Sequence, residues 1–151
     1  MELDKVSKRL SELAVNKPNR YSVEEVDSAL ESKHEGIQVC AAKTLGAWGD
    51  EKSIEKLKNR LEKISKLPAR WGAVSAMSKS LAPHLKQNDI DWVLSLYLNS
   101  SNPHNRFSLS VLLMSLPKIE TLRKLELKLD QGGVDPKDVR NAKAIIQKSA
   151  I

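Results

Sequence analysis

The stretch IQVCAAKTLGAWGD, residues 37–50, combines the apolar spacing of a helix with an unusual share of small side chains. Its larger apolar residues recur at the spacing of one helix face. The Ala and Gly residues between them favour close approach of a neighbouring helix, because interhelical distance depends on the side chains at the contact. Gly49 can adopt the positive φ of a helix C-cap, and Asp50 can cap a helix that follows at once. The stretch therefore predicts a closely packed helix joined to a second one by almost no linker.

Helical spacing of apolar residues recurs along the rest of the chain. Helices are predicted over residues 2–14 and roughly 51–66, on either side of the opening stretch. The later helices are marked by Trp71, Val74, Met77 and Leu81; by Ile90, Val93, Leu94 and Leu98; by Phe107, Val111, Leu112 and Met114; by Ile119, Leu122, Leu125 and Leu129; and by Val139, Ala142, Ile145 and Ile146. Six Gly and six Pro, mostly between these segments, favour helices over the turn-rich pattern of β-sandwiches. The predicted fold class is all-α.

A short second helix is predicted after NKPNR, residues 16–20. Ser22 with Glu25 has the spacing of a capping box. Tyr21 with Val26 has the spacing of a hydrophobic staple. Ser22 is therefore the predicted N-cap of this helix.

Three prolines open predicted helices at nearly constant intervals. Pro68, Pro103 and Pro136 are 35 and 33 residues apart, and Asn102 and Asp135 are placed to cap the last two helices. A fixed period in this range, with two helices per unit, is typical of an α-solenoid. The alternative is a globular helical bundle in which the spacing arises by chance. We expect a single solenoid domain over residues 1–151.

Residues 36–63, GIQVCAAKTLGAWGDEKSIEKLKNRLEK, resemble a helical repeat of the armadillo/HEAT type. The residues that carry the likeness are Ile37, Val39, the small pair Ala41-Ala42, Leu45-Gly46 and the turn Gly49-Asp50. The resemblance implies a short right-handed α-solenoid of about four HEAT-like helical hairpins. It also implies that the second helix of each unit lines the concave side.

Composition places few limits on function. The chain is 40% hydrophobic and 29% charged, as in ordinary globular proteins, and its formal net charge is +6. This excess favours anionic partners without requiring them. Cys40 is the only cysteine, so no intrachain disulfide can form, and its apolar neighbours predict a small core residue. No apolar run of membrane-spanning length and no signal-like segment is present, so we expect a cytoplasmic protein.

Residues with catalytic or metal-binding spacing are scarce. His34, His84 and His104 lie far apart near predicted helix ends, where exposure or capping is the simpler interpretation. Acidic pairs such as Glu24-Glu25 fall in a first helical turn, where the helix dipole favours negative charge. No phosphate-binding loop or nucleophile motif occurs. We therefore expect no enzymatic activity, no cofactor and no metal.

Basic residues form the clearest candidate surface. The candidate binding residues are Lys52, Lys56, Arg60 and Lys63 on one predicted helix and Arg123, Lys124 and Lys128 on another. A solvated outer face is one interpretation of such a charge run. The other is that both helices edge one groove, where lysines would contact phosphates or acidic side chains without reading a base sequence.

The tryptophans have two interpretations as well. Trp48, Trp71 and Trp92 lie on apolar faces and are expected to form core or inter-repeat contacts. The alkylpurine DNA glycosylases are also built of HEAT-like repeats, and they place aromatic and acidic side chains in a concave basic cleft. Asp91, Trp92 and Arg106 would be the candidates for such a site here.

Three functional hypotheses remain open. The preferred one is a protein-interaction module, such as an adaptor, an assembly subunit or an inhibitor, that binds through a concave, partly basic face. The second is a nucleic-acid binder, since residues 34–66 and 102–151 carry basic excess. The third is a structural or oligomeric piece. Ile145, Ile146 and Ile151 near the chain end are expected to be ordinary core, and the alternative is that they face another subunit. The partner and the oligomeric state remain open.

Overall fold

The structure is a computed structural model that describes residues 3–67 and 71–148. Over these ranges it is helical, without a strand, and the α-helices are separated by short connections. The α-helices are α1 (Leu3–Ala14), α2 (Arg20–Leu30), α3 (Glu35–Trp48), α4 (Glu51–Ile64), α5 (Trp71–Leu81), α6 (Ile90–Leu98), α7 (Pro103–Met114), α8 (Lys118–Gln131) and α9 (Pro136–Gln147). Two 3₁₀ turns, η1 (Ala82–His84) and η2 (Gln87–Asp89), connect α5 to α6. The predicted all-α class is confirmed, and none of the described helices is both long and apolar enough to cross a membrane.

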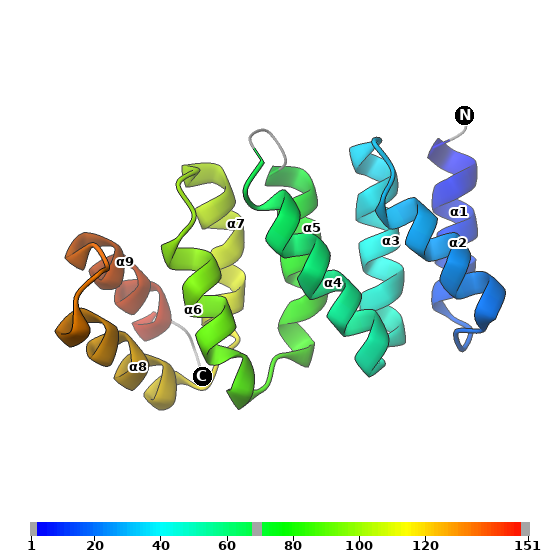
Figure 1. Ribbon diagram of the computed structural model, residues 1–151. Coiled ribbons are helices and arrows are strands. Elements are labelled where there is room, and N and C mark those ends of the chain that lie inside the picture. Colours follow the sequence, from blue (N-terminus) through cyan, green and yellow to red (C-terminus); the bar gives the residue numbers. More distant parts are fainter. Residues whose placement is uncertain (1–2, 68–70, 149–151) are drawn as a thin grey trace.

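The helices form two layers within one compact domain (Figure 1). Helices α1, α3, α5 and α7 pack side by side in a row, and α9 continues this row with less extensive contact to α7. The even-numbered helices form the second layer and pack mainly on odd-numbered ones: α2 on α3, α4 on α3 and α5, α6 on α7, and α8 on α9. Neighbouring even-numbered helices make few backbone contacts with one another. The second layer is therefore the more open of the two.

Small residues of the opening stretch explain how closely the odd-numbered helices pack. Ala41 and Ala42 are fully buried in α3. A Cβ atom added to Gly46 would lie 2.9 Å from Cβ of Ser80 on α5, closer than real Cβ contacts allow. At the other end of these helices, Gly72 lies against the Glu35 carboxylate. Contact at both matching ends shows that α3 and α5 run parallel.

Local capping explains most helix ends. Gly49 ends α3 with φ 65°, and the Asp50 side chain accepts a hydrogen bond from the Ser53 backbone N–H at 3.4 Å at the start of α4. Asn102 and Asp135 cap α7 and α9, whose first residues are Pro103 and Pro136, as predicted. The predicted helix start at Pro68 lies outside the described residues.

The predicted cap of α2 is wrong. Asn19, three residues before Ser22, is the N-cap, and its side chain accepts hydrogen bonds from the backbone N–H groups of Tyr21 and Ser22 at 3.0 Å. Ser22 completes the box by accepting from the Asn19 N–H at 2.8 Å. Tyr21 is 79% exposed and cannot staple the helix end. The carboxamide of Asn19 supplies the same acceptor as a Ser hydroxyl, so spacing alone did not distinguish the two starts.

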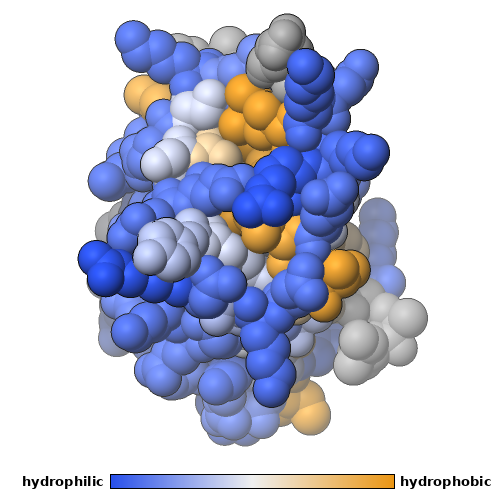
Figure 2. Space-filling view, turned by 90° about the vertical axis from the view of Figure 1, so that its right-hand side faces the viewer, coloured by the Kyte–Doolittle hydropathy of each residue, from blue (hydrophilic) through white to orange (hydrophobic). Residues whose placement is uncertain are grey.

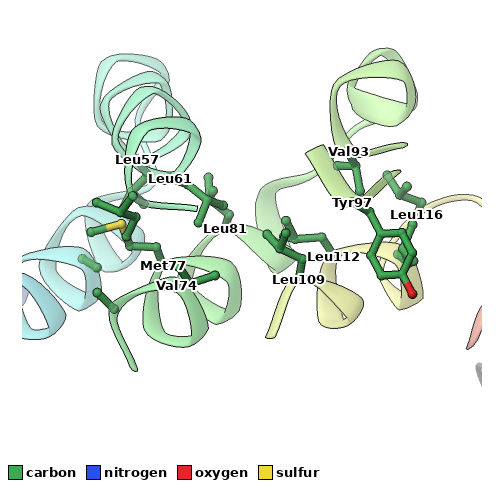
Figure 3. Packing of buried hydrophobic residues seen from close by; sticks show 14 of the residues in the cluster. Leu57, Leu61, Val74, Met77, Leu81, Val93, Tyr97, Leu109, Leu112 and Leu116 are labelled. Carbon is green, nitrogen blue, oxygen red and sulfur yellow. The ribbon is translucent and has the colours of Figure 1, made fainter. Parts of the chain in front are cut away.

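The core runs between the two layers. Figure 3 shows Leu57 and Leu61 of α4 against Met77 of α5, and Val93 and Tyr97 of α6 near residues of α7. Each of these five side chains is 3% exposed or less. A continuous apolar layer of this kind is what holds the two rows of helices together.

Some apolar residues predicted to face inward do not. Phe107 is 81% exposed and Ile119 is 69% exposed. Cys40 is half-buried at the margin of the core rather than within it. Figure 2, which views the end of the molecule that carries α1 and α2, also shows apolar side chains among hydrophilic ones. An exposed apolar residue satisfies helical periodicity as well as a buried one does, so the pattern did not separate them.

Candidate interaction faces

The basic residues predicted on α4 occupy one edge of that helix. Lys52, Lys56, Arg60 and Lys63 follow helical spacing, and two of them contact acidic residues of α2. Lys56 Nζ lies 2.6 Å from the Asp27 carboxylate, and Arg60 Nη1 lies 3.2 Å from that of Glu31. Lys52 and Lys63 are exposed. Half of the predicted stripe on α4 is therefore neutralised by the neighbouring helix.

The basic residues of α8 do not join this stripe. In the second layer α6 lies between α4 and α8 (Figure 1), and α8 contacts α6. Lys124 Nζ lies 3.1 Å from the Asp91 carboxylate of α6. Arg123 and Lys124 line a small cavity together with Glu120, while Lys128 lies further along α8. The two sets of basic residues therefore occupy two separate helices of the same layer.

A groove that the sequence did not predict lies between α4 and α6. Its volume is about 800 Å³. A second cavity of about 350 Å³ shares Glu62 and Trp92 with it and extends it along α6. On the α4 side the groove is lined by Ile54, Glu55, Lys58, Asn59 and Glu62, and on the other side by Pro83, His84, Leu85, Lys86, Asn88, Asp89 and Trp92.

Trp92 connects the two sides of the groove. Its indole Nε1–H donates a hydrogen bond to the Glu62 carboxylate. Lys58 Nζ lies 5.5 Å from the centre of the ring, within cation–π range, and also pairs with Asp89. Long side chains bridge α4 and α6 here, because the two backbones do not pack directly.

Acidic residues of α4 gather on one edge. Glu51, Glu55 and Glu62 follow helical spacing on the edge that lines the groove, where Lys58 lies among them, and the basic edge faces α2. The spacing of the acidic residues along the sequence predicts that they share one edge of α4. The sequence does not show which helix lies beside that edge, so the groove could not be predicted from it.

The three residues considered for a glycosylase-like cleft are separated in the fold. Asp91 lines the cavity beside α8, Trp92 lines the groove beside α4, and Arg106 lines a third cavity beside α9. Arg106 is already engaged: its Nη1 lies 2.7 Å from the Asp138 carboxylate, and Nη2 donates to the Ser100 carbonyl at 2.5 Å. The structure does not bring the three side chains into one site.

The histidines are equally dispersed. His34 and His104 are exposed, and His84 Nε2 donates to the Gly46 carbonyl at 2.8 Å. Across residues 3–67 and 71–148, no group of three His, Cys, Asp or Glu side chains is arranged to hold a metal ion. The hydrogen bond from His84 to Gly46 joins η1 to α3, so a structural role explains this histidine.

Shifted pKa values also have structural causes. The Ser53 hydroxyl hydrogen bond lowers the pKa of Asp50 at the α3–α4 junction. Burial raises the pKa of Tyr97, which packs between α6 and α7. The hydrogen bond to Glu25 raises the pKa of Arg9. Asp50 lies at a helix junction, Tyr97 in the core and Arg9 on the exposed side of α1, so these three groups lie outside the groove.

The site geometry thus consists of an open groove with mixed charge, a half-neutralised basic edge and a separate basic helix. Such surfaces suit contact with another macromolecule, and their chemistry is that of ion pairs, hydrogen bonds and aromatic packing. Comparison of the chain with protein-family models, curated proteins and solved structures found no match.

Proposed function

We propose that this chain is a non-enzymatic protein-interaction module, built as a short right-handed α-solenoid of about four HEAT-like hairpins. Support comes from polar contacts that join residues about one repeat apart. The pairs Lys56–Asp27, Trp92–Glu62, Lys124–Asp91, Thr44–Leu10 and Trp48–Leu13 are separated by 29, 30, 33, 34 and 35 residues. These separations agree with the spacing of the helix-opening prolines. They are what stacked repeats require, since each repeat contacts only its neighbours.

The groove between α4 and α6 is the observation that carries the proposal. It offers a half-buried aromatic and apolar floor, Trp92 and Ile54, between charged side chains of both signs. Aromatic anchors within a polar surround are typical of protein interfaces. In this proposal the even-numbered layer binds an extended segment of a partner, and the basic edge of α4 borders the contact.

Affinity purification from the native host, followed by mass spectrometry, tests the proposal. The variant Glu51→Lys/Glu55→Lys reverses charge beside the groove at exposed positions, so the far-ultraviolet circular dichroism should not change. Loss of a partner that the wild type retains would support binding in the groove. The variant Asp4→Lys/Glu12→Lys, at exposed positions of α1 that do not line the groove, makes the same charge change and is the matched control. Equal recovery of every partner by both variants would remove the α4 surface from the interface.

Nucleic-acid binding is the second candidate. Its basis is the net charge of +6, together with Arg123, which is exposed on α8 and has no ion-pair partner within the described part of the chain. Neutralisation of Lys56, Arg60 and Lys124 by acidic neighbours weakens this candidate. Phosphate binding falls steeply with salt, so a gel shift at low salt that shows no complex would exclude it.

A cytoplasmic location belongs to the same proposal. Cys40 is a free thiol in the structure. Unpaired cysteines are ordinary in reducing compartments. The proposal is therefore an adaptor that binds its protein partner in the cytoplasm.

A further inference from the structure

The outer face of α3, α5 and α7 is poor in acidic residues. These three helices contain a single acidic residue, Glu35, whereas α4 alone contains Glu51, Glu55 and Glu62. Glu35 is half-buried, and its carboxylate lies over Gly72 at one end of the contact between α3 and α5. The face therefore differs in kind from the charged layer on the opposite side of the domain.

The exposed positions on this face follow helical spacing. Helices α3 and α5 run parallel and pack side by side, and α7 packs next to α5. The side of each helix that faces neither its neighbours nor the even-numbered layer is left open to solvent. Apolar or small residues there, all half-buried or exposed, are Val39, Cys40, Ala47, Ala76, Val111 and Met114. The charged residues among them are Lys43 and Lys79, both exposed.

A cavity lies at the α7 end of this face. Its volume is about 400 Å³, and its lining combines Tyr97, Phe107 and Ile145 with polar residues, Arg106 among them. Phe107 is 81% exposed, although Phe is among the residues that gain most from burial. The cavity exists because α9 packs on α7 less extensively than the preceding odd-numbered helices pack on one another.

We propose that this outer face is a second docking surface, separate from the α4–α6 groove, and that it binds an acidic amphipathic helix of another protein. The cavity beside Phe107 receives an apolar side chain, and Lys43 and Lys79 contact carboxylates. Low charge together with exposed aromatic and Met side chains is the composition of interface centres. Charge favours an acidic occupant, because among the described residues of α3, α5 and α7 the face offers two exposed lysines, whereas its one carboxylate, Glu35, is half-buried. A second copy of this chain docked face to face would bring lysines toward lysines.

Binding of synthetic peptides tests the proposal directly. One fluorescent amphipathic peptide of about 18 residues, roughly 27 Å long as a helix, carries Leu and Phe on one face and Glu on the other. A second peptide has Lys in place of Glu. We expect the acidic peptide to bind more tightly by fluorescence anisotropy, and amide chemical-shift changes to cluster on Lys43, Lys79 and Phe107.

Two surface variants locate the contact. Lys43→Glu/Lys79→Glu should weaken the acidic peptide by about tenfold and favour the basic one, because charges across an interface govern partner choice. Phe107→Ser should weaken both peptides with unchanged circular dichroism, since the side chain is exposed. Lys52→Glu/Lys63→Glu on α4 is the control and should leave affinity unchanged.

Three results would overturn the proposal. The first is equal affinity for acidic and basic peptides. The second is a set of shift changes confined to the α4–α6 groove, which would leave the proposed function standing and remove only this face. The third is a dimer in analytical ultracentrifugation that Phe107→Ser converts to monomer, which would identify a second copy as the occupant.

Discussion

Gly46 determines how closely α3 and α5 approach. A Cβ atom at this position would lie 2.9 Å from Cβ of Ser80, so any larger residue would force the two helices apart. Gly in a helix interior normally costs about 0.5–1 kcal/mol relative to Ala. The close contact between two parallel helices offsets that cost through dispersion and apolar burial. The small residues of 37–50 thus have a packing explanation and need no functional one.

Asp50 allows α4 to begin immediately after α3 ends. Replacing Asp50 with Ala should lower the free energy of unfolding by about 1 kcal/mol at neutral pH, because the backbone N–H of Ser53 loses its acceptor. Hydrogen bonding lowers the folded-state pKa of Asp50 below its unfolded value. This stabilisation is therefore present above the unfolded pKa and is lost as pH falls through the folded pKa.

Urea denaturation of the wild type and Asp50→Ala across the acid range measures this effect. The difference in unfolding free energy should shrink below about pH 4, where a free Asp carboxyl titrates. Asp50→Asn is the control, since it retains a capping acceptor and does not titrate. A difference between the wild type and Asp50→Ala that stays constant down to full protonation would contradict the assignment.

Helix α4 shows how one element can carry two surfaces. Its core side contributes Leu57, Leu61 and Ile64, which are fully buried. Of its two remaining edges, the basic one contacts α2, and the other, which carries three Glu residues and Lys58, lines the groove toward α6. Charged residues of α4 therefore contact α2 and α6 as well as solvent.

The Asp27–Lys56 pair gives a quantitative test of the contact between α2 and α4. A double-mutant cycle with Asp27→Ala and Lys56→Ala should yield a coupling energy of about 0.2–1 kcal/mol, because the pair is partly exposed and screened by solvent. The coupling should decrease in high salt. The same cycle between Asp27 and Lys63, for which no contact is present in the described structure, should give no coupling. Equal coupling in both cycles would show a general charge effect instead of a specific pair.

Across the whole molecule, packing is uneven from the centre to the C-terminal end. Helix α5 contacts α3, α4 and α7, whereas α9 contacts α7 less closely and α8 packs mainly on α9. Buried residues of α8 are limited to Thr121 and Leu125. Stability in stacked helical arrays depends on contact between neighbours.

Hydrogen exchange should follow this gradient. Backbone amides of α8 and α9 should exchange faster than those of α3 and α5 under native conditions, because fewer buried contacts must open. Mass spectrometry of peptic fragments can resolve the two regions. Amides of α2 serve as an internal comparison near the other end of the row. Uniform protection from α3 to α9 would show that the domain opens only as one cooperative unit.

The sequence by itself determined the helical class, most helix boundaries and the repeat-like spacing. These features depend on local physics: apolar residues at helical intervals, a left-handed Gly49, and the caps Asp50, Asn102 and Asp135. Each acts within a few residues along the chain, so its consequence can be read locally. The Ser22 cap was wrong because Asn19, close by, provides an equivalent acceptor.

Only the tertiary structure decided which charges are paired, where the groove lies and which apolar residues remain exposed. Lys56 and Arg60 meet acidic partners because α2 lies beside α4, and Lys124 meets Asp91 because α6 lies beside α8. Phe107 is exposed because α9 leaves a cavity beside α7. These outcomes depend on the offset between helices that are tens of residues apart. Helical periodicity fixes the face of a side chain along its own helix, and it carries no information about that offset.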